Sequence, residues 1–166
     1  MDYRDQLLLA VRTRIASRRL ELGLSQETLA REAGLHRNTV AYYERGITEP
    51  TLCSITRILM TLGTKGLQFD DKRGISSLEV PGSSALPLSM VSRETALEVF
   101  GAAVESRRSV FGCSQECLAE RMGCSRNTVG EIERGEVDPK ITTILKIFCA
   151  LNVSLVTYRE GVLRFE

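Results

Sequence analysis

The sequence predicts a mainly α-helical protein made of two tandem copies of one small helical unit, each followed by a short β-strand. The first observation is a repeat, since residues 25–46 (SQETLAREAGLHRNTVAYYERG) return without a gap at residues 114–135 (SQECLAERMGCSRNTVGEIERG), an offset of 89 positions (114 minus 25). The second is that apolar residues recur at helical spacing on both sides of each copy. These patterns predict domains over residues 1–70 and 91–166, joined by a linker over 71–90.

Four helices are expected in each domain, separated by glycines that allow sharp left-handed turns. In the first copy, the side-chain oxygen of Ser25 can cap the amide groups that begin a second helix, and Gly34 turns the chain into a third. Pro50 suits the start of a fourth helix. We therefore expect helices over residues 5–22, 25–33, 36–45 and 51–62, with the same register 89 positions later.

A short strand is expected after each fourth helix. Residues 67–69 (LQF) alternate apolar and polar side chains, and residues 156–158 (VTY) occupy the equivalent positions of the second copy. The alternation continues on both sides of Glu160 and Gly161, which fits either a hairpin or one long bent strand. Residues 71–90 are rich in Ser, Gly and Pro, as is usual in a linker.

Charge is distributed unevenly along the chain. The net charge of the 166 residues is only +1, but residues 1–66 carry 10 Lys/Arg against 7 Asp/Glu, whereas residues 90–166 carry 10 against 11. Any binding to nucleic acid therefore depends on a locally basic face, which the first copy offers. No apolar run is long enough to span a bilayer, and the first residues do not form a leader sequence, so a cytoplasmic protein without membrane contact is expected.

Cysteine and histidine patterns give no support to a metal site or an enzyme. The five cysteines are odd in number, and Cys113, Cys117 and Cys124 stand where the first copy has Leu, Thr and Leu, which is typical of small core residues. His36 is the single histidine and lies beside no nucleophile, and no Gly-rich phosphate loop is present. We expect free thiols, no cofactor, no metal and no catalysis.

The third helix of each copy has the residues needed to contact base pairs. An α-helix fits the major groove of B-DNA, where each base pair presents a distinct pattern of donors and acceptors. Arg37 and Arg126 can form paired hydrogen bonds with guanine, and Asn38 and Asn127 can do so with adenine. The amides of the glutamines that follow Ser25 and Ser114 suit contacts with phosphate.

Three motifs occur in both copies: SQETLA or SQECLA, RNTV after each turn, and YERG or IERG ahead of a proline. These motifs resemble the helix-turn-helix family of lambdoid phage repressors and Cro proteins, often called the XRE family. The resemblance covers both copies and implies two lambda repressor-like domains. It implies structural pairs between Arg19 and Glu44 and between Arg108 and Glu133. It also implies a DNA-binding surface made of Gln26, His36, Arg37, Asn38, Tyr42 and Arg45 in the first copy and Gln115, Ser125, Arg126, Asn127, Glu131 and Arg134 in the second.

The two predicted surfaces are not equal. Where the first copy has Tyr42, the second has Glu131, whose carboxylate can accept a hydrogen bond from cytosine or weaken the attraction to phosphate. We expect the first copy to be the main reader and the second to be a weaker head or a dimerisation partner. His36 is as compatible with a helix N-cap or a solvated position as with base contact, and of the adjacent tyrosines Tyr43 is assigned to the core.

The leading hypothesis is a sequence-specific transcriptional regulator, a repressor, that inserts both third helices into double-stranded DNA. The strands resemble those of HipB-type antitoxins, which pair across a dimer, so a pseudo-dimer within one chain and a homodimer both stay open. The alternative is a protein-interaction or antitoxin-type module that binds a partner such as a toxin and contacts little DNA. Salt dependence of DNA binding discriminates between the two.

Overall fold

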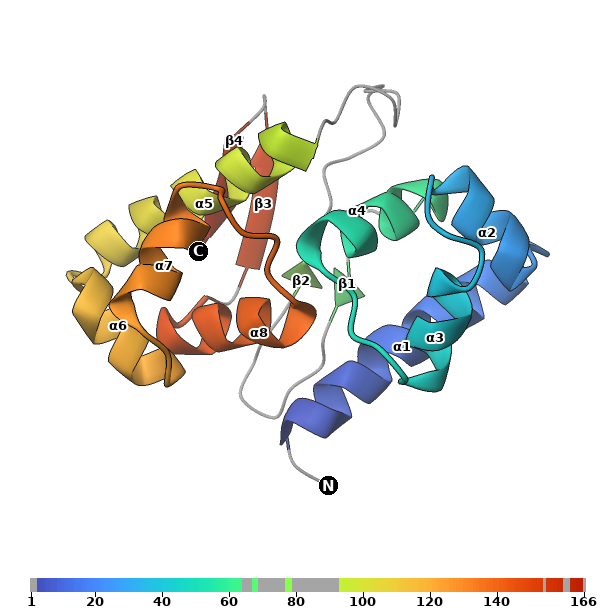
Figure 1. Ribbon diagram of the computed structural model, residues 1–166, viewed down its shortest axis with the longest axis horizontal. Coiled ribbons are helices and arrows are strands. Elements are labelled where there is room, and N and C mark those ends of the chain that lie inside the picture. Colours follow the sequence, from blue (N-terminus) through green and yellow to red (C-terminus); the bar gives the residue numbers. More distant parts are fainter. Residues whose placement is uncertain are drawn as a thin grey trace.

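A computed structural model describes residues 3–63, 67–68, 77–78, 93–153, 155–159 and 162–165. Its helices fall into two groups, which we call the amino-terminal head (α1–α4) and the carboxy-terminal head (α5–α8) (Figure 1). The helices are α1 (Tyr3–Glu21), α2 (Gln26–Glu32), α3 (Thr39–Arg45), α4 (Leu52–Thr61), α5 (Arg93–Val110), α6 (Gln115–Met122), α7 (Arg126–Glu133) and α8 (Ile141–Ala150). The expected mainly α-helical fold with two tandem helix-turn-helix units is confirmed.

The helix starts follow from local capping. The hydroxyl oxygen of Ser25 accepts a hydrogen bond from the amide of Thr28 at 3.0 Å, as expected, and that of Ser125 accepts one from Thr128 at 3.2 Å. The third helix was expected to begin at His36, but α3 begins at Thr39. His36 stands at the position of Ser125, and its Nδ1 accepts a hydrogen bond from the amide of Asn38 at 3.4 Å. Residues 37–38 form a turn ahead of α3, closed by a bond of 2.8 Å from the amide of Thr39 to the carbonyl of His36, and the N-cap residue Asn38 makes no side-chain cap bond.

Four short strands lie beside the helices: β1 (Leu67–Gln68), β2 (Ser77–Leu78), β3 (Leu155–Arg159) and β4 (Val162–Phe165). They form one sheet in the order β1-β2-β3-β4, in which only the central pair, β2 with β3, is parallel. β2 lies inside the segment that we expected to be a linker, and it separates β1 from β3. Phe69, Glu160, Gly161 and the remaining residues of 71–90 lie outside the described part of the chain.

The two heads meet at the starts of α4 and α8, where hydrogen bonds between them are related by two-fold symmetry. The amide of Leu52 donates to the carbonyl of Pro139 at 2.8 Å, and the amide of Ile141 donates to the carbonyl of Pro50 at 2.9 Å. Since 52 and 141, like 50 and 139, are 89 positions apart, each head gives the other the same bond. Reciprocal contacts of this kind define an isologous interface, which is usually made by two identical chains.

Side chains follow the same two-fold symmetry. Asp138 accepts a hydrogen bond from the amide of Cys53 at 3.1 Å, and Glu49, its equivalent, accepts one from the hydroxyl of Thr142 at 2.5 Å. Cys53 and Thr142 are also 89 positions apart. The amide groups at the start of α4 have no partner inside their own helix, so the other head provides acceptors that these groups need.

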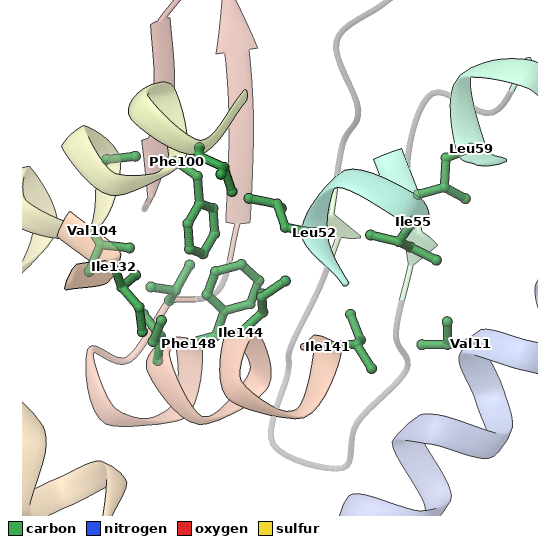
Figure 2. Packing of buried hydrophobic residues seen from close by; sticks show 14 of the residues in the cluster. Val11, Leu52, Ile55, Leu59, Phe100, Val104, Ile132, Ile141, Ile144 and Phe148 are labelled. Carbon is green, nitrogen blue, oxygen red and sulfur yellow. The ribbon is translucent and has the colours of Figure 1, made fainter. Parts of the chain in front are cut away.

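Apolar packing joins the heads as well, because the buried residues of both form one continuous cluster. Figure 2 shows Leu52 of α4 beside Phe100 of α5, and Ile141 of α8 directed toward Val11 of α1. Contacts between α4 and α5 and between α1 and α8 are again equivalent under the 89-residue offset. Cys149 is exposed, and so are the helix-ending residues Leu22 and Phe111.

In the described residues, no helix is both long enough and apolar enough to cross a membrane.

Candidate nucleic-acid interface

Each head contains a helix pair joined by a tight turn. In the amino-terminal head, α2 and α3 are joined through Gly34 (φ 64°), and in the carboxy-terminal head α6 and α7 are joined through Gly123 (φ 65°). This left-handed conformation favours glycine, as the sequence predicted. Leu29 and Val40 in one head, with their counterparts in the other, are buried between the helices and hold each pair in place.

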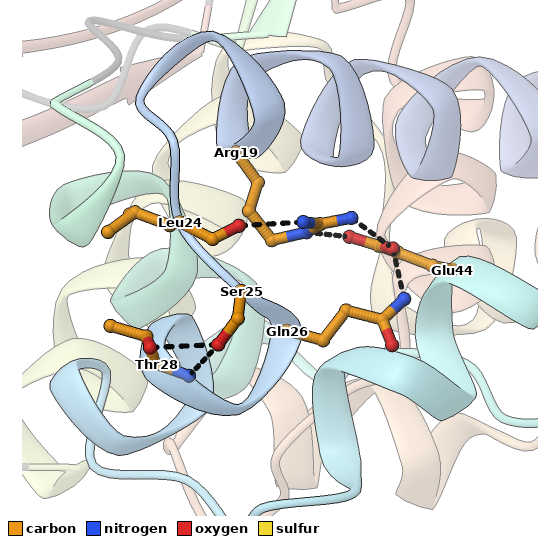
Figure 3. Close-up of polar contacts among 6 residues, drawn as sticks. All are labelled: Arg19, Leu24, Ser25, Gln26, Thr28 and Glu44. Carbon is orange, nitrogen blue, oxygen red and sulfur yellow. Dashed lines mark hydrogen bonds and ion pairs between the residues drawn. The ribbon is translucent and has the colours of Figure 1, made fainter.

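A buried ion pair ties the last helix of each pair to the first helix of the head. Arg19 of α1 and Glu44 of α3 are joined by two parallel hydrogen bonds, at 2.7 and 3.0 Å, and Arg19 also donates to the carbonyl of Leu24 at 2.7 Å (Figure 3). Arg108, Glu133 and Cys113 repeat this arrangement at 2.5, 3.1 and 2.9 Å. Both predicted pairs are confirmed, and their burial gives them a structural role.

Gln26 and Gln115, predicted to contact phosphate, belong to these same clusters. The side-chain nitrogen of Gln26 donates to Glu44 at 2.5 Å, and that of Gln115 donates to Glu133 at 2.7 Å. An amide nitrogen carries two hydrogens, so one N–H of each glutamine remains for a further acceptor. The ion pair thus holds the orientation of each glutamine at the start of α2 and α6.

The remaining predicted residues of the amino-terminal head lie at the protein surface. His36, Arg37, Tyr42 and Arg45 are exposed, and Asn38 is half-buried. Tyr43 is buried, which confirms the assignment of the two adjacent tyrosines. We call this surface, His36, Arg37, Asn38, Tyr42 and Arg45, the amino-terminal recognition surface.

The equivalent residues form the carboxy-terminal recognition surface: Ser125, Arg126, Asn127, Glu131 and Arg134. All are exposed except Glu131, which is half-buried. Gly130 of α7 is buried, and a Cβ placed on it would lie 2.9 Å from the guanidinium of Arg134. The arginine side chain therefore covers the glycine.

Two glutamates that the sequence reasoning missed hold the arginines of this surface. Glu116 Oε1 lies 2.7 Å from Nε of Arg126, and Glu136 makes two hydrogen bonds of 2.7 Å with Arg134. Glu136 follows Arg134 by two residues, which is a signal that a search for local charge pairs would have found. The Glu116 pair joins α6 to α7 and depends on how these helices cross.

Titration follows these contacts. The pKa of Glu116 is lowered, first by a hydrogen bond from its own backbone amide at the start of α6 and further by Arg126. The hydrogen bonds between Arg134 and Glu136 lower the pKa of the carboxyl and raise that of the guanidinium. Both carboxyl groups are therefore ionised between pH 5 and 8.

The cysteines near this surface are thiols without a disulfide. Burial raises the pKa of Cys113, which is further raised by its hydrogen bond with Cys117, and burial also raises the pKa of Cys124. No group of three or more metal-binding side chains occurs within the described residues. The packing of Cys113 against the core agrees with its interpretation as a small apolar residue.

Comparison with known proteins assigns both helix pairs to one family. A family model for helix-turn-helix proteins (HTH_3) matches residues 15–68 and 111–157. An uncharacterized HTH-type transcriptional regulator of Methanothermobacter thermautotrophicus is 40% identical over 58 residues, which are 35% of this chain and 84% of that relative. Because the family model covers more than half of the chain and matches each head, the protein belongs to the helix-turn-helix family.

Proposed function

We propose that this protein is a sequence-specific DNA-binding transcriptional regulator in which one chain presents two recognition helices, α3 and α7, to two half-sites of one operator. The observation that carries this proposal is the reciprocal contact between the heads, from Leu52 to Pro139 and from Ile141 to Pro50. A two-fold arrangement of recognition helices matches the inverted half-sites that dimeric helix-turn-helix proteins bind. The chain is thus a covalent pseudo-dimer, and the half-sites are expected about 34 Å apart.

Local chemistry supports DNA as the partner. Arg37 and Asn38 have the donor and acceptor groups for guanine and adenine edges, and the remaining N–H of Gln26 suits a phosphate. The relative from Methanothermobacter is named a transcriptional regulator, which agrees with this class of function. Binding of both heads covers a stretch of DNA without any further interaction, so we propose repression as the regulatory effect.

Selection of bound duplexes from random DNA tests the proposal. The intact chain is expected to enrich two inverted half-sites at fixed spacing, and native mass spectrometry should find one chain for each duplex. Arg37→Ala should relax the base preference at one position and weaken binding by about 1–3 kcal/mol. Absence of any enriched sequence would contradict the proposal and favour a module that binds a partner protein.

A stoichiometry of two chains for each duplex would keep DNA binding but replace the pseudo-dimer by a homodimer. The sign of regulation is tested separately, by placing the selected operator over a promoter in a reporter assay. Repression requires lower transcription when the protein is present, and the Arg37→Ala variant should relieve it.

A further inference from the structure

The same glutamate and arginine stand at equivalent positions of both heads but form an ion pair in only one of them. Glu116 and Arg126 are joined at 2.7 Å in the carboxy-terminal head. Glu27 and Arg37 occupy the same positions 89 residues earlier, yet no ion pair joins them among the described residues. The same two side chains are thus paired on one recognition surface and unpaired, among the described residues, on the other.

The residue before each arginine explains this difference. Ser125 caps α7, so that Arg126 is the first residue of the helix and its side chain leaves from a helical turn beside α6. His36 stands in place of this serine, and Arg37 precedes α3, which begins only at Thr39. Arg37 lies in the turn ahead of α3, which the amide of Thr39 closes by donating to the carbonyl of His36 at 2.8 Å, and within the described residues its guanidinium is not paired with Glu27.

A second arginine of each surface shows the same contrast for an independent reason. Arg134 is bound by both carboxylate oxygens of Glu136, whereas the equivalent of Glu136 in the amino-terminal head is Ile47, whose side chain cannot accept a hydrogen bond. Arg45 is exposed and has no ion-pair partner within the described part of the chain. Within the described residues, both arginines of the amino-terminal surface lack an ion-pair partner, whereas both arginines of the carboxy-terminal surface have one.

We propose, building on the function above, that the two heads bind unequal half-sites: the amino-terminal head binds a strong half-site through Arg37 and Arg45, and the carboxy-terminal head binds a weak one. Glu116 and Glu136 compete with DNA for the arginines of the weak head, so each DNA contact there first requires an ion pair to open. The groups that remain are Asn127 and the carboxylate of Glu131, which accept hydrogen bonds from the amino groups of adenine and cytosine. The operator is therefore asymmetric, and the chain binds it in one orientation.

Matched variants of the full-length chain test this inference. Glu116→Gln removes the competitor of Arg126, and Glu27→Gln removes the same charge from the equivalent position, where no ion pair is broken. Affinity for the selected duplex is measured by fluorescence anisotropy over a range of KCl concentrations. Both sites are exposed helix positions, and circular dichroism checks that each variant keeps its helices.

Glu116→Gln is expected to tighten binding about 3- to 10-fold and to make the slope of log K against log[salt] steeper by about one phosphate contact. Glu27→Gln should leave the slope unchanged and alter the affinity by less than about two-fold. Equal effects of the two variants, or two half-sites selected with equal strength, would overturn the inference while leaving DNA binding established. If no duplex is enriched at all, the proposed function and this inference fail together.

Discussion

In both heads, an arginine, a glutamate and a glutamine form the same buried cluster, whereas the arginines on the two recognition surfaces have different partners. Distances within the clusters agree to a few tenths of an ångström, as between Gln26 and Glu44 at 2.5 Å and Gln115 and Glu133 at 2.7 Å. On the surfaces, Arg126 is paired and Arg37 is not, within the described residues. Buried polar groups need complete hydrogen bonding, which constrains the cluster in both copies, while exposed groups can vary because water satisfies them.

The largest effect on stability is expected from the buried clusters of arginine, glutamate and glutamine. Measuring it tests whether these clusters stabilise the two heads equally. Glu44→Gln and Glu133→Gln each leave an arginine buried without its counter-charge, which should lower the free energy of unfolding by about 3 kcal/mol in either head. Urea denaturation followed by circular dichroism measures the change. A loss below 1 kcal/mol in one head alone would show that the clusters are not equivalent.

A smaller effect on stability is expected at a position where α1 and α5, the first helices of the two heads, pack differently. Gly101 of α5 is buried, and a Cβ there would meet the backbone carbonyl oxygens of Glu133 and Ile132, the latter at 2.6 Å. Gly101→Ala should therefore lower the free energy of unfolding by about 1–3 kcal/mol, although alanine favours a helix.

The control for this change is Arg12→Ala, because Arg12 stands at the equivalent position of α1 and is only half-buried. The melting temperature of the Arg12→Ala variant should remain within about 2 °C of the wild type, as for most changes outside the core. If Gly101→Ala instead raised the melting temperature, the close approach of α5 to α7 would be refuted.

Exchange of the helix caps tests why the two recognition helices differ in length. Ser125→Ala removes the cap of α7 and should lower the free energy of unfolding by about 1 kcal/mol. His36→Ser introduces a cap for α3 and should raise it by up to about 1 kcal/mol, with Arg37 drawn into the helix. NMR chemical shifts of residues 36–39 report the added turn, and unchanged shifts would count against the capping explanation.

The smallest effect concerns pH at the contact between the heads. Burial, together with Asp138, raises the pKa of the Cys53 thiol to about 11, so the folded chain holds this proton more tightly than the unfolded chain. The resulting stability is complete below the ordinary thiol pKa of about 8.5 and is lost as the pH rises toward 11. Cys53→Ser, which does not ionise, should show a smaller decline over this range in thermal unfolding.

Alkylation measured by mass spectrometry provides an independent readout of the same thiol. At pH 8, Cys53 should react with iodoacetamide more slowly than the exposed Cys149, because only the thiolate is the nucleophile. Equal rates at the two cysteines would show that Cys53 is not held as a neutral thiol between the heads.

Many elements of the fold and the site were predictable from the sequence. The glycine turns, the cap at Ser25 and the pairs of Arg19 with Glu44 and of Arg108 with Glu133 all depend on short motifs that the repeat displays twice. The predicted start of α3 at His36 was wrong because residues 37–38 form a turn ahead of the helix, where the ring of His36 accepts a hydrogen bond from the amide of Asn38. Glu116 and Glu136 were missed because the search followed the positions expected to face DNA.

The sequence by itself determined the two helical units, their equivalent positions and the residue types on each recognition surface, because periodicity, caps and turns depend on residues a few positions apart. Only the tertiary structure decided that Pro50 accepts a hydrogen bond from Ile141 and that Arg126 is held by Glu116. These contacts join helices whose crossing is set by packing of the whole core, and no local pattern contains that information. The charge available for DNA on each head is therefore a property of the folded chain.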